Sequence, residues 1–215
     1  VKTVTCREAK TYEPTEAGEW GDTPLHVALL DLGRKNNIVR CLQKRGCRVT
    51  VLPGTTTAAQ LAALHPDGLM LSNGPGDPDA VTETYEQARE LIGKVPVFGI
   101  CLGHQLMALA MGGRTVQMKY GHHGANHPVK DLAHDRTYIT SQNHGYAVLG
   151  ETVNPDIARV SHININDNTC EGIEHLHAPI FTVQYHPEVK PGPEDTAYLF
   201  DQFIALMDEK KGGAQ

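Results

Sequence analysis

The stretch Val97-Phe98-Gly99-Ile100-Cys101-Leu102-Gly103-His104-Gln105 decides the fold of this chain. A short β-favouring run leads into Gly-x-Cys-x-Gly, and a helical pattern follows at once. This is the strand, sharp turn and helix of a nucleophile elbow, with cysteine where hydrolases place serine. Flanking glycines allow close backbone approach around a strained residue, and the start of a helix favours a thiolate. The pattern indicates a nucleophile, although a buried structural cysteine in a tight turn has the same signature.

A second motif supplies the base that a thiol nucleophile needs. The run 180–185 reads as a strand that ends at His186-Pro187-Glu188. Cysteine chemistry requires a base for the thiol proton and a third group that orients the base. The alternation of an extended segment puts His186 and Glu188 on the same side. We therefore predict a catalytic set of Cys101, His186 and Glu188.

The N-terminal half outside these motifs alternates short apolar runs with helical patterns. Strands are expected at 26–31, 47–52, 68–72 and 95–100, and helices near 38–42, 58–64, 83–92 and 102–111. Such alternation calls for right-handed βαβ crossovers and a parallel sheet, whose active sites lie at the carboxyl ends of the strands.

Beyond Gly113 the alternation of strands and helices ends, and expected strands follow one another without long helices between them. Further strands are expected at 115–120, 128–132, 137–141, 159–165, 172–176 and 180–185, with a closing helix at 194–210. We predict the α/β class: an open, mainly parallel twisted sheet flanked by helices, with added antiparallel strands in the C-terminal half.

Composition narrows the class of protein. The chain has 215 residues, a formal net charge of −6 and 40% apolar residues, which is ordinary globular usage. The acidic balance argues against nucleic-acid binding, and no apolar run is long enough for a membrane span. The five cysteines include no Cys-x-x-Cys pair, so a reducing cytoplasm fits better than a disulfide framework or zinc site.

Two loops are candidates for completing the site. Tetrahedral oxyanions need backbone N–H donors, and we expect these from Leu102, beside the nucleophile, and from Gly74 in the loop 72–78. The alternative for that loop is a plain turn. In the segment 141–146, Asn143 and the backbone around Gly145 are suited to bind an amino acid, and Gln105 is expected at the pocket mouth.

The segment 121–127, Gly-His-His-Gly-Ala-Asn-His, suggests a metal cluster at first sight. No Asp, Glu or Cys is spaced with these histidines to complete a set of ligands. We therefore predict no metal in this chain.

The assembled motifs resemble the class I, triad-type glutamine amidotransferases. The resemblance rests on 98–105, 72–78 and 186–188; the segments 121–129, 142–148 and 191–193 are similar to those of glutaminase domains in carbamoyl-phosphate synthase small subunits. It covers roughly residues 24–210. We expect residues 24–215 to be the amidotransferase domain and residues 1–23 a linker or the remnant of a preceding N-terminal domain.

The resemblance implies glutamine hydrolysis through a γ-glutamyl thioester on Cys101, with ammonia passed to a large synthetase subunit. It implies glutamine contacts from Gly74, Gly76, Leu102, Gln105, Asn143, Gly145 and Tyr146. ATP and magnesium would bind only on the partner subunit, and this chain would need no cofactor. In this family an N-terminal domain of the small subunit lends a substrate contact, and that domain would be missing here.

Two other functions remain open on these residues. One is a γ-glutamyl hydrolase or related cysteine peptidase on the same fold. The other is a scaffold subunit that binds a synthetase without making ammonia.

Overall fold

The described residues, 1, 3–16, 23–189 and 196–212, build an α/β fold around one ten-stranded sheet in the computed structural model. The strand order is β1-β3-β2-β4-β5-β10-β9-β7-β6-β8. The strands are β1 Lys10–Tyr12, β2 His26–Asp31, β3 Arg48–Pro53, β4 Gly68–Leu71, β5 Val97–Ile100, β6 Thr115–Asp131, β7 Arg136–Val148, β8 Ala158–Asn164, β9 Cys170–His175 and β10 Ile180–Val183. The predicted α/β class is confirmed.

Five neighbouring strands, β3, β2, β4, β5 and β10, are parallel. Their short apolar runs alternate between two buried faces, because successive side chains of a strand point to opposite sides of the sheet. Val27 and Leu29 of β2 belong to one core cluster, and Ala28 and Leu30 belong to the other. The parallel part of the sheet is therefore covered on both sides.

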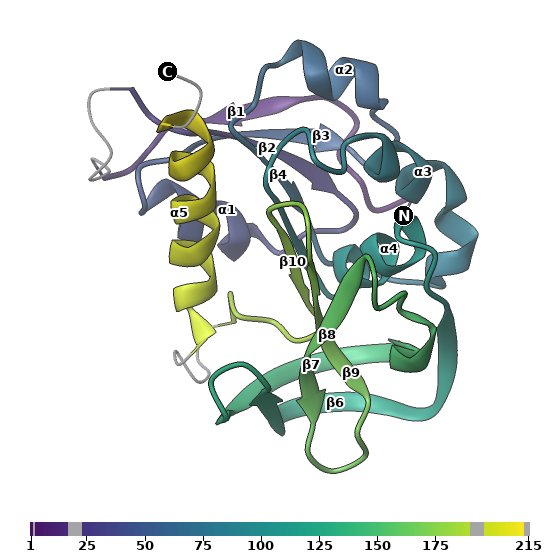
Figure 1. The fold of residues 1–215 in the computed structure, drawn as a ribbon. Helices are drawn as coiled ribbons and strands as arrows, with labels where there is room; N and C mark the ends of the chain where they lie inside the picture. Colours follow the sequence, from purple (N-terminus) through teal and green to yellow (C-terminus); the bar gives the residue numbers. More distant parts are fainter. Residues whose placement is uncertain (2, 17–22, 190–195, 213–215) are drawn as a thin grey trace.

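The helices are divided between these two faces (Figure 1). α1 (Asn36–Gln43) and α5 (Tyr198–Gly212) pack on the face of Val27. α2 (Ala58–Ala63), α3 (Thr82–Glu90) and α4 (Leu102–Ala110) pack on the face of Ala28. Short 3-10 turns, η1 (Pro78–Val81) and η2 (Gly150–Thr152), complete the described elements. The carboxyl ends of β4, β5 and β10 are left to carry the site.

The C-terminal strands pair antiparallel, and two of them are longer than expected. The runs predicted at 115–120 and 128–132 belong to a single 17-residue strand, β6, and the strand predicted at 137–141 continues through 148 as β7. The register between them shifts twice, and glycines with positive φ, Gly121 (69°) and Gly124 (135°), lie in or next to the shifted stretches. Glycine-bearing bulges let a strand pass through what reads as a loop in sequence.

The segment expected as a linker or remnant contributes an edge strand. β1 pairs antiparallel with β3, and the Thr5 hydroxyl accepts a hydrogen bond from the Gly54 N–H at 2.8 Å. The Cys6 N–H donates to Asp31 at 3.1 Å. These contacts attach residues 5–12 to β3 and to the carboxyl ends of β2 and β3. The domain division itself stays a prediction.

Across the described part of the chain, none of the helices combines the length and the apolar character that crossing a membrane requires.

Candidate active site

Cys101 stands between β5 and α4 in a strained backbone conformation, with φ 54° and ψ −104°. Positive φ is uncommon for a residue with a Cβ and is held here by the packing around it. A Cβ on Gly99 would lie 2.8 Å from the carbonyl oxygen of Gly103, and one on Gly103 would lie 2.3 Å from that of Leu71. Both glycines are therefore required by close backbone approach. The strand–turn–helix elbow predicted from the sequence is present.

His186 lies between the two groups that sequence reasoning assigned to it. Its Nδ1 is 2.8 Å from Oε1 of Glu188, which leaves Nε2 for the hydrogen bond with the Cys101 side chain. All three side chains are buried. Burial opposes protonation of the ring, but the hydrogen bonds that the ring makes to Cys101 and Glu188, together with the charges of these two groups, prevail and raise the pKa of His186 to about 9. A protonated imidazole next to the thiol favours a thiolate–imidazolium pair, which is the reactive form.

Two residues of the α1 region complete the surroundings of Glu188, and sequence reasoning missed both. Lys35 Nζ is 3.7 Å from Glu188 Oε1, and the Asn37 side-chain amide donates to the Glu188 carbonyl. Only the folded sheet brings them to the carboxyl end of β10. Their sequence neighbourhood carries no motif that signals this role.

The proposed oxyanion donors lie side by side. Leu102 opens α4, where the first N–H groups of a helix have no intrahelical acceptor. A Cβ on Gly74 would come within 2.1 Å of the Leu32 carbonyl oxygen and 2.9 Å of Leu102 Cδ2, so the loop after β4 presses directly against the elbow. The Gly103 N–H donates to the Ser72 carbonyl at 3.2 Å and fixes that contact.

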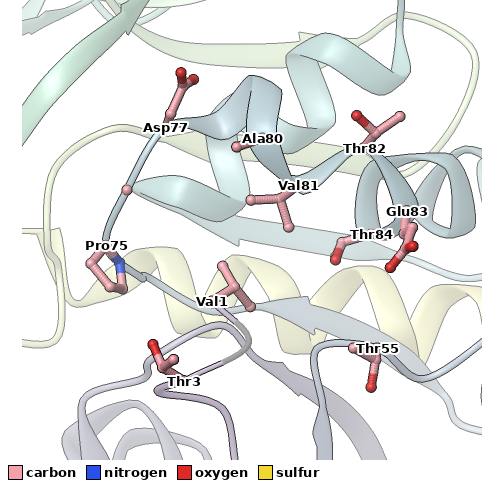
Figure 2. Close-up of a pocket in the computed structure, with 11 residues that line it drawn as sticks. Val1, Thr3, Thr55, Pro75, Asp77, Ala80, Val81, Thr82, Glu83 and Thr84 are labelled. Atoms are coloured by element: carbon pink, nitrogen blue, oxygen red, sulfur yellow. The ribbon is translucent and has the colours of Figure 1, made fainter.

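Gly76 lies further along this loop and faces a separate cleft. It has φ +103°, and a Cβ there would meet no atom within 4 Å. The cleft has a volume of about 520 Å³ and lies between the 75–84 segment, Thr55 and the first residues of the chain. Figure 2 shows the side chains of Val1 and Val81 pointing into it from opposite sides. Among the contacts of the described residues, none joins Gly76 to the elbow.

Gln105 is buried in the first turns of α4 rather than open at the pocket mouth. Its Nε2 donates to the Tyr146 carbonyl at 2.8 Å and to Gln184 Oε1 at 2.9 Å. The Tyr146 carbonyl also lies 2.7 Å from His144 Nδ1. Gln105 thereby connects the elbow helix to the β7 residues that the resemblance assigns to glutamine.

Asn143 and Gly145 lie on the same strand with different surroundings. Asn143 is exposed, and its Oδ1 is hydrogen-bonded to His123 Nδ1 at 2.8 Å. Gly145 is half-buried and has open space where a side chain would be. The His186 N–H donates to the Ser141 carbonyl at 2.9 Å, so the start of this segment is fixed to the catalytic loop.

No Asp, Glu or Cys is spaced in the sequence to share a metal with the histidines of segment 121–127. The fold nevertheless places a carboxylate beside the histidines of β6 and β7. Ligand atoms of His122, His144 and Glu171 lie within 4.8 Å of one another. Glu171 comes from β9, so no local spacing could have shown it. The prediction that the chain holds no metal is untested by this geometry, and the cluster is considered again below.

His104, in the first turn of the elbow helix, is a packed, fully buried histidine. Its Nδ1 is 2.8 Å from the Thr182 hydroxyl, and burial lowers its pKa to about 3. It is therefore neutral and takes no part in the Cys101–His186 pair.

Fold and geometry define the class of protein: an α/β protein that presents a cysteine on a strand–helix elbow beside a buried histidine–carboxylate pair. The family follows from sequence. Residues 28–206 match the family model described as glutamine amidotransferase class-I, and the chain belongs to that family.

The chain is similar to curated relatives described as carbamoyl phosphate synthase small chain. It is 57% identical over 188 residues to the protein of Staphylococcus haemolyticus, which covers 87% of this chain and 51% of the relative. It is 50% identical over 221 residues to that of Syntrophotalea carbinolica, covering 98% and 58%. The chain thus spans between half and three-fifths of the length of these relatives.

A solved structure shows the same fold. A Thermoplasma acidophilum protein described as a GMP synthase subunit superposes with a TM-score of 0.77 at 22% identity. The match covers 89% of this chain and 98% of that one, so most of this chain shares that architecture.

Proposed function

We propose that this chain is the glutaminase part of a carbamoyl-phosphate synthase small subunit. The carrying observation is the buried Cys101–His186–Glu188 set on the strand ends of the sheet. The amidotransferase family and the similarity to small chains support the substrate, L-glutamine, and the product, ammonia.

The reaction follows from the geometry. The Cys101 thiolate attacks the side-chain amide carbon of glutamine, and the Leu102 and Gly74 N–H groups stabilise the oxyanion. The C–N bond breaks as the His186 imidazolium gives its proton to the departing ammonia, which leaves a γ-glutamyl thioester. His186 then takes a proton from water, the hydroxide attacks the thioester carbon, and glutamate leaves as the thiolate reforms. Glu188 holds the ring throughout.

The glutamine contacts are proposed at Gly74, Gly76, Leu102, Gln105, Asn143, Gly145 and Tyr146. Ammonia passes to a large synthetase subunit that carries ATP and magnesium, and this chain itself needs no cofactor. The further partner is an N-terminal domain of the small subunit. The proposed function involves no nucleic acid and no membrane. The five free cysteines fit a reducing cytoplasm.

The test uses the full protein that contains this sequence, assembled with its synthetase subunit. Cys101→Ser abolishes glutamine hydrolysis and glutamine-dependent carbamoyl phosphate formation, whereas synthesis from added ammonia continues. Cys6→Ser, at a half-buried thiol outside the catalytic set, is the matched control and keeps both activities. Undiminished glutaminase activity in Cys101→Ser contradicts the proposal.

The same assay separates the two alternative functions. A γ-glutamyl hydrolase cleaves γ-glutamyl peptides in preference to free glutamine, and a scaffold subunit releases no ammonia in the wild type. Either result replaces the proposed function.

A further inference from the structure

A buried polar network connects β9 to the part of β7 that is proposed to bind glutamine. Glu171 is its centre, with no exposed surface. Oε2 of Glu171 accepts from Gln142 Nε2 at 3.0 Å, and Oε1 accepts from Asn164 Nδ2 at 3.3 Å. A buried carboxylate is retained in a fold only where such partners satisfy it.

Gln142 relays this contact, because the Glu171 carboxylate determines which way its amide is turned. Its Nε2 donates both hydrogens, to Glu171 and to the Thr140 hydroxyl at 3.1 Å. Its Oε1 is then turned toward two rings, 2.8 Å from His122 Nδ1 and 2.9 Å from His144 Nε2. The flipped amide would set an oxygen against the Glu171 carboxylate, so Glu171 fixes the orientation.

His144 carries the connection to the proposed substrate strand. Its ring lies between Gln142 Oε1 and the Tyr146 carbonyl, at 2.9 and 2.7 Å. Burial lowers the pKa of His144 to about 4, so the neutral ring donates its one N–H to one of these two oxygens and packs against the other. The same carbonyl accepts from Gln105 on the elbow helix. The exposed Asn143 side chain and Gly145 therefore lie on a strand whose buried residues, Gln142 and His144, are both held by this network.

His122 places a positive charge between two carboxylates, those of Glu171 and Asp167. Its Nε2 is 2.9 Å from Asp167 Oδ2, and its Nδ1 is 3.2 Å from Glu171 Oε1. The hydrogen bond with Glu171 is the main cause that raises the pKa of His122 to about 9, against the opposing effect of burial. The ring is thus an imidazolium at neutral pH, and its charge balances the buried carboxylate.

Metal binding is the alternative role to consider for His122, His144 and Glu171. Both nitrogens of both rings already lie within 2.9 Å of hydrogen-bonding oxygens. Ligation would require breaking these contacts, so the geometry favours a positioning network.

We propose that Glu171 is a positioning residue for glutamine: it orients Gln142, which holds His144 and through it the β7 segment 143–146 against the elbow helix. The inference rests on the proposed glutaminase function. It assigns Glu171 no part in the chemical steps, since among the described residues its side chain is hydrogen-bonded or ion-paired with neither Cys101 nor His186.

The test is Glu171→Gln in the full protein, assayed for glutamine hydrolysis at pH 7. A glutamine at 171 must present its NH2 to one of the donors around it, so Gln142 or Asn164 loses an acceptor. We expect the KM for glutamine to rise about tenfold, with kcat within about twofold of the wild type. Alkylation of Cys101 by iodoacetamide keeps its rate, because the Cys101–His186 pair is untouched.

Glu174→Gln is the matched control. Glu174 lies on the same strand and pairs with Arg159 at 2.6 Å on a partly exposed face, so its KM for glutamine stays at the wild-type value. Gln142→Ala is the second variant and raises the KM by a similar factor. Adding Glu171→Gln to Gln142→Ala raises it no further, because both residues act along one line of contacts.

The outcomes separate the two claims. If the wild type releases no ammonia from glutamine, the proposed function fails and the positioning role fails with it. If the wild type is active but Glu171→Gln and Gln142→Ala share the KM of Glu174→Gln, only the positioning role is wrong. Parallel losses of kcat and melting temperature without a change in KM also contradict it, because they indicate a structural role alone.

Discussion

The chemistry at residue scale rests on side chains that meet only in the folded chain. Cys101 and His186 lie at the ends of the adjacent parallel strands β5 and β10, which pair in register from Val97–Ile180 to Ile100–Val183. The sequence predicted their roles because each residue type has a recognisable local context, an elbow and a strand end. Lys35 and Asn37 were missed because a lysine and an asparagine at the start of a helix have no such context.

Substitution of the histidine and of its carboxylate partner should differ in cost. His186→Ala removes the base and acid, and we expect kcat for glutamine to fall about 10³-fold or more. Glu188→Ala leaves the ring in place without its 2.8 Å partner, and we expect a smaller loss of about 10–10². Steady-state kinetics on variants with wild-type circular dichroism measure both. A larger loss in Glu188→Ala would contradict the assigned roles.

The elbow is the element that the sequence predicted best. Its backbone leaves no room for a Cβ on either flanking glycine. The Gly-x-Cys-x-Gly spacing by itself therefore predicted the strand–turn–helix elbow. The β6–β7 pair was the least predictable element. Its glycines and histidines read as turn and metal-cluster signals, whereas two register shifts allow the strands to run through them. Glu171 was invisible as their partner because it joins them from β9.

Gly103→Ala tests the elbow as an element. A Cβ at that position lies 2.3 Å from the Leu71 carbonyl, and backbone atoms cannot move aside cheaply. We expect the free energy of unfolding to fall by about 3 kcal/mol, at the upper end of overpacking costs. Gly145→Ala is the control, because nothing lies within 4 Å of its Cβ, and it should cost less than about 1 kcal/mol. Urea denaturation measures both, and equal losses would contradict the close approach.

The whole molecule is a parallel sheet covered by helices on both faces and extended by an antiparallel region that supplies the proposed substrate strand (Figure 1). The alternation of strands and helices predicted the first part because crossover geometry is nearly invariant. The pairing order of the antiparallel strands could not be predicted from the sequence, since sequence patterns do not determine which distant strands pair. The His186 N–H, just beyond β10, donates to the Ser141 carbonyl of β7 and joins the two parts. Two histidines have raised pKa values, His186 at this junction and His122 within the antiparallel region.

His122 makes stability depend on pH. Its folded pKa is about 9, whereas an unfolded histidine titrates near about 6.5. Between these values the folded chain holds a proton on His122 that the unfolded chain has released, so the free energy of unfolding falls as pH rises from about 6.5 to 9. His186 adds little to this slope, because the proton on its ring is the one that the Cys101 thiol gives up in the thiolate–imidazolium pair. Urea denaturation across this range measures the slope.

His122→Asn should flatten that slope, because it removes the retained proton. His123→Asn is the control, at an exposed neighbour on the same strand, and should keep the wild-type slope. A wild-type stability that is constant or rises over this range would contradict the charge pairing of His122 with Glu171.

The central claim is that Cys101 is the nucleophile of a glutamine site. The most direct measurement treats the protein with a glutamine-directed affinity label and maps the modified residue by peptide mass spectrometry. The account predicts modification at Cys101 that excess glutamine blocks. Labelling confined to other cysteines, or labelling of Cys101 that glutamine does not slow, would contradict it.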